Sequence, residues 1–252
     1  MCYLILEIKK STLKGLILMT ILIATHNLSK NYSEASSIIN TLLKCLPDVV
    51  FLSEFNYKEH KKTIYNRLID EGYELYLPCE YKQTLTSSCL LAIKNKNTLV
   101  TNFEQTKRPK ITLSSRYITG KLELVSGDTL HLFFCYAPQL IFKDPKLKKA
   151  RLEHKRNMIG DMKDFCEEKR GLHVMIAGDF NTDLQDGLDD VHRRDFNDIY
   201  EMMIDTEPNK DSTYYKKRLD YALVSSNLKN SHTILLSTPS DHKALVTRII
   251  MS

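Results

Sequence analysis

The chain has 252 residues, of which 42% are hydrophobic and 27% are charged, and its formal net charge is +5. This composition excludes a disordered or fibrous chain and is typical of a globular domain with a sizeable core. Charged residues from Glu7 to Lys14 interrupt the apolar N-terminal stretches, so no segment approaches the ~20 residues of a membrane span. The six cysteines form no Cys-x-x-Cys pair, which argues against a zinc or redox motif. We expect a cytoplasmic protein with reduced thiols and no signal peptide.

The first part of the chain alternates short strands with helices. Met19 directly precedes a predicted strand at 20–25, so we expect residues 1–18 to be an N-terminal extension, which could add an edge strand, and residues 19–252 to be one domain. Apolar spacing predicts helices at 33–45, ending before Pro47, and at 59–71, with Gly72 just beyond the last turn. A fully apolar strand is expected at 49–52.

The rest of the chain mixes hairpins with helical connections, which implies mixed sheets. Strands are predicted at 73–78, 89–94, 98–101, 118–125, 130–136, 173–177, 219–224, 233–236 and 244–250, and helices at 146–170 and 195–203. Gly127-Asp128 is a hairpin signal. Two sheets stacked face to face and covered by helices suit this pattern and length, which is an α/β (α+β) architecture.

Polar signatures lie at the ends of the apolar strands, where α/β folds carry functional loops. Glu54 directly follows the strand at 49–52, where a carboxylate can be a hard oxygen ligand for Mg²⁺ or Mn²⁺; the alternative is a solvated strand-end glutamate. In Gly178-Asp179-Phe180-Asn181 the carboxylate can orient a water and the amide can donate to a phosphate oxygen. The alternative for this second signature is an Asx turn.

Two further signatures lie near the C-terminus. Ser240-Asp241-His242 precedes the last strand, and a histidine suits acid–base chemistry; the alternative is a capping turn. Such a histidine usually needs a second carboxylate to fix its tautomer, and Asp220 of Arg218-Leu219-Asp220-Tyr221 is the candidate. Arg218 itself could be an ordinary surface charge.

Together and in this order, the signatures resemble the endonuclease/exonuclease/phosphatase superfamily, whose fold is that of pancreatic DNase and exonuclease III. Thr25-His26-Asn27-Leu28 is similar to its first motif, residues 47–54 to its metal-glutamate motif, and Tyr136-Ala137-Pro138 to its Tyr-x-Pro motif. The resemblance spans residues 20–250 and implies a four-layer sandwich of two packed mixed sheets flanked by helices.

The resemblance also implies how substrate and metal are held. Glu54 is expected to be the principal Mg²⁺ ligand, with Asn27 and Asp241 near the metal, and Mn²⁺ is expected to substitute for Mg²⁺. Tyr136 and Asn181 are expected to contact the scissile phosphate.

The chemical roles follow in the same way. Asp179 is expected to orient or deprotonate the attacking water, and His242, paired with Asp220, to lie against the phosphate as a proton-transfer or electrostatic group. Which of Asp179 and His242 is the base stays open at this stage. The chain has no tryptophan, and Lys217 stands where abasic-site endonucleases of the superfamily often carry an aromatic residue.

A basic segment follows the Tyr-x-Pro motif, and it bears on the substrate. It contains Lys143, Lys146, Lys148, Lys149, Arg151, Lys155 and Arg156. Residues 107–110 form a second basic cluster. Such patches attract a nucleic-acid backbone, although a solvated helix face is the plain alternative. The resemblance further places Arg151 beside the site as a phosphate contact.

Three functions remain in play from the sequence. The first is a DNA endonuclease or exonuclease. The second is a phosphodiesterase or phosphatase acting on a cyclic nucleotide, a phospholipid headgroup or an inositol phosphate. The third is a catalytically dead binding module, against which the intact set of polar residues argues. No obligate protein partner is evident.

Overall fold

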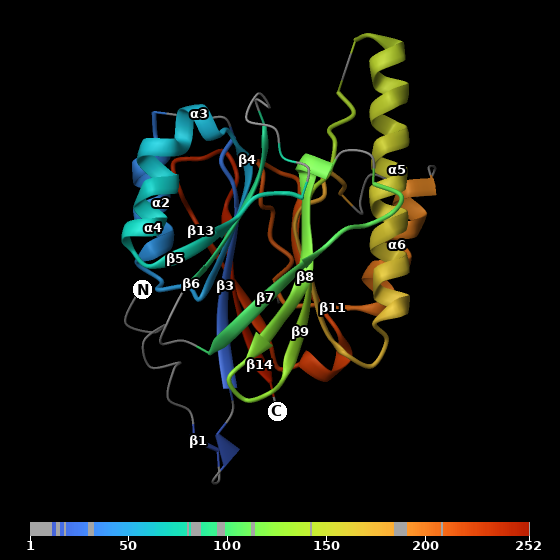
Figure 1. Cartoon of the computed structure of the whole chain (residues 1–252). Helices are drawn as coiled ribbons and strands as arrows, with labels where there is room; N and C mark the ends of the chain where they lie inside the picture. Colours follow the sequence, from blue (N-terminus) through green and yellow to red (C-terminus); the bar gives the residue numbers. More distant parts are fainter. Residues whose placement is uncertain are drawn as a thin grey trace.

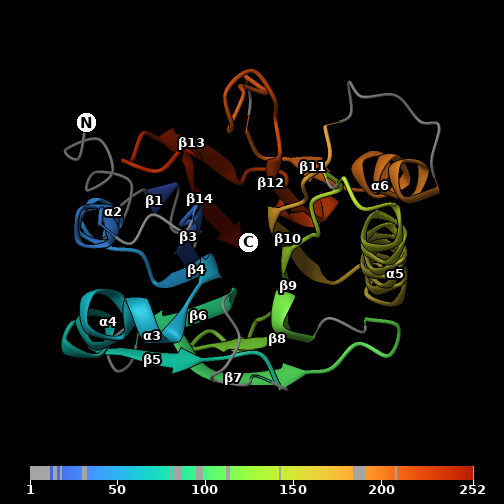
Figure 2. The ribbon, with the colours of Figure 1, turned by 90° about the horizontal axis from the view of Figure 1, so that it is seen from above.

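The structure, a computed structural model, consists of two six-stranded mixed sheets packed face to face, with helices on both outer faces (Figures 1 and 2). It describes residues 12–13, 16–17, 19–29, 33–79, 81, 87–94, 99–111, 114–141, 143–183, 191–207 and 209–251. The expected four-layer α/β sandwich is confirmed.

The first sheet has the strand order β13-β14-β3-β4-β6-β5, and only β3 and β4 in it are parallel. Its strands are β3 (Met19–Asn27), β4 (Val49–Phe55), β5 (Tyr73–Tyr76), β6 (Ser88–Lys94), β13 (His232–Leu236) and β14 (Ala244–Met251). Its outer face is covered by α2 (Ala35–Leu43) and by a run of α3 (Tyr57–His60), a π-helical turn (Lys61–Tyr65) and α4 (Asn66–Asp70). Ile38, Ile39 and Leu42 are the buried side of α2, as the helical spacing predicts.

The second sheet has the order β11-β12-β10-β9-β8-β7, with β9 and β10 parallel. Its strands are β7 (Val100–Thr106), β8 (Tyr117–Leu124), β9 (Thr129–Tyr136), β10 (His173–Asp179), β11 (Ile204–Asp205) and β12 (Asp220–Val224). Helices α5 (Pro145–Glu168) and α6 (Val191–Met202) lie on its outer face (Figure 2). None of the helices in the described residues is long and apolar enough to cross a membrane.

The main core lies between the two sheets. Phe51 of β4 stacks on Phe134 of β9 with ring centroids 4.9 Å apart. Every residue of β4 is buried because one face of the strand meets the other sheet and the opposite face meets the helices. This explains why residues 49–52 of the strand are a continuous apolar run rather than an alternating one.

The structure differs from the sequence prediction at β7 and β11. The strand expected at 98–101 runs instead from Val100 to Thr106, because its pairing with β8 continues as far as Thr119. The two-residue strand β11 was not predicted. In the N-terminal extension, Thr12–Leu13 pairs with Leu16–Ile17 as a separate ribbon rather than as an edge strand of either sheet; most of residues 1–18 lies outside the described part of the chain.

Candidate active site

A buried triad of Asp179, Asp220 and His242 forms the centre of the site. Nδ1 of His242 lies 2.7 Å from Oδ2 of Asp220. One side-chain ligand atom from each of the three residues lies within 4.8 Å of the others. The sequence-based pairing of His242 with Asp220 is therefore the arrangement found in the structure.

Strand pairing explains how distant residues meet here. Asp179 ends β10 and lies directly opposite Asp220, the first residue of antiparallel β12. Gly178 has φ +129°, and a Cβ built on it would lie 2.1 Å from the backbone oxygen of Cys135. Only glycine allows β10 to approach β9 this closely at the position directly before Asp179.

Two asparagines hold the Asp179 carboxylate in place. Asn27 at the end of β3 donates to its Oδ2 at 2.8 Å, and this bond crosses between the sheets. Asn181 donates to Oδ1 through its backbone N–H at 2.8 Å and to Oδ2 through its amide at 2.9 Å. Asp179 thus forms an Asx turn with the backbone of Asn181 and is also paired with the Asn181 side chain, so both interpretations of the Gly178–Asn181 motif apply. The Asn181 amide also donates to the carbonyl of Ala137 at 2.9 Å, so in this arrangement it orients Asp179.

Glu54 and Tyr136 form a second bridge between the sheets. The Tyr136 hydroxyl donates to Oε1 of Glu54 at 2.8 Å, and both residues are buried. Glu54 has φ +57° and lies at a shift in the pairing of β4 with β6, between Ser53 and Phe55. Such a bulge changes the direction of a side chain at the end of a strand, here toward the other sheet.

Asp241 lies at the exposed rim of the centre. Its carboxylate accepts a hydrogen bond from Ser29, and Ser29 is also 2.8 Å from the hydroxyl of Ser240. Ser240 accepts from the backbone N–H of His242 at 3.2 Å and donates to the carbonyl of Asn27 at 2.8 Å. The Ser240 turn therefore does cap the last strand, and it also ties Asp241 and His242 to the end of β3.

Electrostatics separate the two groups that could act as a base. Burial, and after it the Asp220 carboxylate, raise the pKa of Asp179 to about 7 against the lowering effects of His242 and the two asparagines. Burial lowers the pKa of His242, but the charge and hydrogen bond of Asp220 outweigh this effect and raise it to about 9. These pKa values favour a cationic His242 at neutral pH, whereas Asp179 titrates near neutral pH.

Two arginines lie beside Tyr136. The guanidinium of Arg116, just before β8, stacks over the Tyr136 ring at 4.2 Å. Its Nη1 is buried and has no hydrogen-bond partner among the described residues. Arg151 of α5 is close enough to Arg116 that burial and this second cation lower its pKa. The sequence did not indicate that Arg116 lies at the site, because a single arginine before a strand is not part of a recognisable motif.

An aromatic residue covers His242. The ring of Tyr214 lies 4.7 Å from the imidazole, with Tyr215 packed edge-on against it. Tyr214 therefore places an aromatic ring beside His242. The sequence had suggested that this aromatic residue is absent, because Lys217 stands at the position where related enzymes often carry it. The Tyr214-Tyr215 pair, four and three residues before Arg218, was the available signal in the sequence.

Two basic features play structural roles. Arg218 is not a surface charge: it is buried and forms a bidentate ion pair with Asp205, the second N···O distance being 2.7 Å. The basic cluster at 107–110 is largely neutralised by α5, because Arg108 pairs with Glu168 at 2.9 Å and Lys110 pairs with Asp164. This second cluster is therefore not an open anion-binding patch.

The residues at this edge offer the oxygen donors that Mg²⁺ prefers. Tyr136 engages Oε1 of Glu54, and Asn27 Oδ1 accepts one bond, from the backbone N–H of Ser29 at 2.8 Å. The triad is a second group whose ligand atoms lie within 4.8 Å of one another, with Nδ1 of His242 bonded to Asp220. The Glu54 side of the centre could hold a magnesium ion through carboxylate and amide oxygens.

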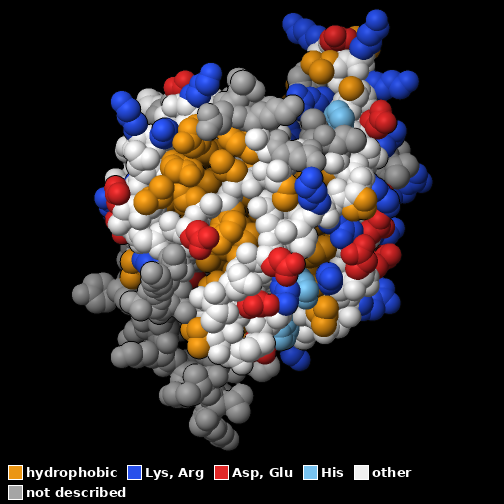
Figure 3. Space-filling model, in the orientation of Figure 1, with side chains coloured by type: hydrophobic (Ala, Val, Ile, Leu, Met, Phe, Trp, Pro, Cys, Tyr) orange, Lys and Arg blue, Asp and Glu red, His pale blue; other side chains and the backbone are white. Residues whose placement is uncertain are grey.

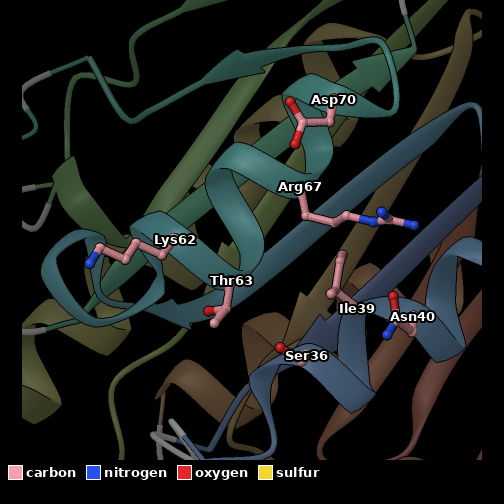
Figure 4. A pocket seen from close by; sticks show the side chains of 7 residues that line it. All are labelled: Ser36, Ile39, Asn40, Lys62, Thr63, Arg67 and Asp70. Atoms are coloured by element: carbon pink, nitrogen blue, oxygen red, sulfur yellow. The ribbon is translucent and has the colours of Figure 1, made fainter.

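Two cavities of about 400 Å³ flank the described part of the molecule. One adjoins the triad and is lined by Asn181, Tyr214 and residues of α5 and α6. The other lies between α2 and α4, where Arg67 points across the gap toward Asn40 and Ile39 (Figure 4). This second cavity lies on the outer face of the first sheet and contains no part of the triad.

Comparisons with known proteins assign the family. The profile of the Endonuclease/Exonuclease/phosphatase family matches residues 24–242. The chain belongs to this family. Members of the endonuclease/exonuclease/phosphatase family are phosphoester hydrolases. No curated protein sequence matches the chain at a significant level.

Solved structures of other endonuclease/exonuclease/phosphatase proteins share the fold. An AP endonuclease from Archaeoglobus fulgidus is 18% identical over 90% of this chain and 98% of its own, with a TM-score of 0.65. The human Nocturnin catalytic domain with bound sulfate is 16% identical over 92% and 95%, with a TM-score of 0.65. D. rerio TDP2, complexed with a single-strand DNA product, is 14% identical over 92% and 99%, with a TM-score of 0.65.

Proposed function

We propose that this protein is a Mg²⁺-dependent phosphodiester hydrolase that acts on DNA as an endonuclease or exonuclease. The observation that carries the proposal is the junction of the two sheets, where Asn27 binds Asp179 and Tyr136 binds Glu54 beside the His242–Asp220 pair. A buried carboxylate with a raised pKa beside a buried imidazolium is the combination that in-line attack on a phosphate needs.

The roles of the groups follow from their surroundings. Asp179, oriented by its asparagines, accepts the proton of the attacking water. His242, held cationic by Asp220, lies against the phosphate and stabilises the negative charge that develops there. Bound Mg²⁺, held by Glu54 with Asn27 and Asp241 nearby, would neutralise charge on the phosphate and the leaving oxygen.

Two further contacts support a phosphate substrate. The guanidinium groups of Arg116 and Arg151 lie close together near Tyr136, although like charges repel. A phosphate bound beside the two guanidinium groups would offset that repulsion. We assign both arginines as substrate phosphate contacts.

The nature of two structural relatives favours nucleic acid as the substrate. One relative is an AP endonuclease, and the TDP2 relative holds a single-strand DNA product. Their low identity carries only the fold, so DNA is the proposal for this chain and a small phosphodiester is the competing substrate. We place the activity in the cytoplasm, since the described residues Cys79, Cys89, Cys135 and Cys166 are free thiols.

Incubation with plasmid DNA and Mg²⁺ tests the proposal. We expect nicking or degradation that EDTA abolishes, that Mn²⁺ supports and that Glu54→Gln and His242→Gln reduce by at least a hundredfold. His232→Gln, at an exposed histidine on β13, is the matched control and should retain full activity. Intact DNA together with hydrolysis of a cyclic nucleotide or an inositol phosphate would replace the nuclease proposal with the small-substrate alternative.

A further inference from the structure

The N-terminal part of α5 extends beyond the body of the protein on the active-site side (Figure 1). Residues 143–150, which we call the α5 arm, are all exposed. Lysine and arginine side chains lie on both sides of the tip of this projection in the space-filling view, with an acidic group and apolar atoms between them (Figure 3). The arm carries Lys143, Lys146, Lys148 and Lys149 and a single carboxylate, Asp144.

The charge of the arm works against the local stability of the helix. Asp144 is used as the N-cap and accepts the backbone N–H of Lys146 at 2.9 Å, and no acidic residue follows in the first turn. Cations near a helix N-terminus oppose the helix dipole and so weaken the first turn of the helix. Among the described residues, no ion pair compensates Lys146, Lys148 or Lys149. Departures from local stability of this kind occur mainly at functional sites. A cluster of cations at such a site is suited to a polyanionic partner.

A cavity connects the arm to the active centre. It runs from Lys148 on the arm past Lys155 to Asn181, beside Asp179. Lys155 is buried and donates to the backbone oxygen of Asn181, so it marks the edge of the centre. No Asp or Glu is among the described residues that line this cavity, whereas Lys148, Lys155, Arg193 and Lys217 are.

We propose that the α5 arm is a strand-binding element that holds backbone phosphates of a nucleic-acid strand where it leaves the active centre. The inference rests on the proposed phosphodiesterase function and narrows its substrate to a polynucleotide. A membrane surface would leave the cavity between Lys148 and Asn181 unused, whereas a strand leaving the active centre passes through it.

The test compares two matched triple variants. The first carries Lys146→Gln, Lys148→Gln and Lys149→Gln, since glutamine keeps the helix propensity. The control carries Lys44→Gln, Lys169→Gln and Lys229→Gln, which lie outside the arm next to the opposite ends of the strands, before β4, before β10 and after β12. Binding of 12-nucleotide single strands of DNA and of RNA is measured by fluorescence anisotropy in EDTA, so that cleavage plays no part.

We expect the slope of log Kd against log salt concentration to decrease by about 2 in the arm variant, from three lost contacts at ~0.7 each, and to stay unchanged in the control. The KM for the 12-nucleotide strand should rise, whereas kcat/KM for bis(p-nitrophenyl) phosphate should not change. The difference between DNA and RNA identifies the preferred strand.

Three results would overturn the inference: an unchanged salt slope, an equal decrease in the control, or loss of binding to phosphatidylserine vesicles alone. The last result would assign the arm to a membrane surface. A wild-type protein that hydrolyses no phosphodiester, but whose arm variant loses the salt slope, would refute the proposed activity and leave strand binding by the arm intact.

Discussion

The hydroxyl of Tyr136 on β9 donates a 2.8 Å hydrogen bond to Glu54 on β4, so one bond joins the two sheets at the centre of the site. The partners are 82 residues apart in the chain. The bond fixes one carboxylate oxygen of the proposed metal ligand, and the same tyrosine ring lies under the guanidinium of Arg116. The proposed metal ligand and the proposed phosphate contact thus share Tyr136 as a neighbour.

Tyr136→Phe should lower kcat by about tenfold to a hundredfold, since a hydrogen bond to a charged group contributes about 1.5–3 kcal/mol. The Mg²⁺ concentration for half-maximal rate should also rise, because the Glu54 carboxylate is no longer held. Tyr73→Phe, which removes a buried hydroxyl donating to Pro47, should cost stability without moving the Mg²⁺ dependence. Equal Mg²⁺ requirements for Tyr136→Phe and wild type would contradict the assigned link.

Asp179→Asn should reduce kcat by about 10²–10⁴-fold with little effect on KM, since the amide keeps the shape but cannot accept a proton. With Asp179 as base, the rate should rise with pH through about 7, and added divalent metal should move this midpoint downward because the cation favours the carboxylate. A rise centred near pH 9 would identify His242 as the base instead.

Asp220→Asn should bring the pKa of His242 down from about 9, because it removes the carboxylate that raises it and leaves burial, which lowers it. Selective ¹³C-histidine NMR measures the titration, with His242→Gln identifying the resonance. Because the pKa of His242 is higher in the folded protein than in the unfolded chain, protonation of His242 stabilises the wild-type fold. This contribution is complete below the unfolded pKa of about 6.5 and is lost as the pH rises through about 9. Its size is roughly 3 kcal/mol, so the variant should lack this alkaline loss of stability in urea unfolding.

Gly178→Ala should destabilise the protein by about 3 kcal/mol or more, because φ is +129° and the added Cβ would meet the Cys135 oxygen at 2.1 Å. The control is Gly160→Ala in α5, where nothing lies within 4 Å of an added Cβ. That change should stabilise the protein by about 0.5–1 kcal/mol, since alanine favours the helix. Thermal unfolding of both variants distinguishes a special backbone position from a general intolerance of alanine.

His26 should contribute to acid unfolding. It is buried, and burial together with the charge of His242 lowers its pKa from 6.5 to about 3. The His26 imidazole therefore binds a proton more readily in the unfolded chain than in the folded one. As a result, the free energy of unfolding has its full value above pH 6.5 and decreases as the pH falls toward about 3. At pH 5 the loss is roughly 2 kcal/mol. His26→Gln should flatten this dependence in urea unfolding between pH 7.5 and 5, and an unchanged slope would refute the assignment.

The sequence predicted most of the fold because most elements carry strong local signals. The apolar runs around Ile23, Phe51 and Ile176 and the helical spacing of Ile38, Ile39 and Leu42 fix strand and helix identity by burial alone. Elements that depend on long-range pairing were less predictable. The end of β7 is set by its pairing with β8, and β11 exists only through two residues paired with β12.

The sequence by itself determined which residue types gather at the strand ends, because motifs such as Gly178-Asp179-Phe180-Asn181 combine local backbone needs with chemistry in adjacent positions. Only the tertiary structure decided how those groups face one another. The bulge that turns Glu54 toward Tyr136 and the bond from Asn27 to Asp179 both cross between the sheets, and the stacking of Arg116 on Tyr136 joins residues 20 positions apart in the chain. Such contacts depend on sheet packing, which no local pattern encodes.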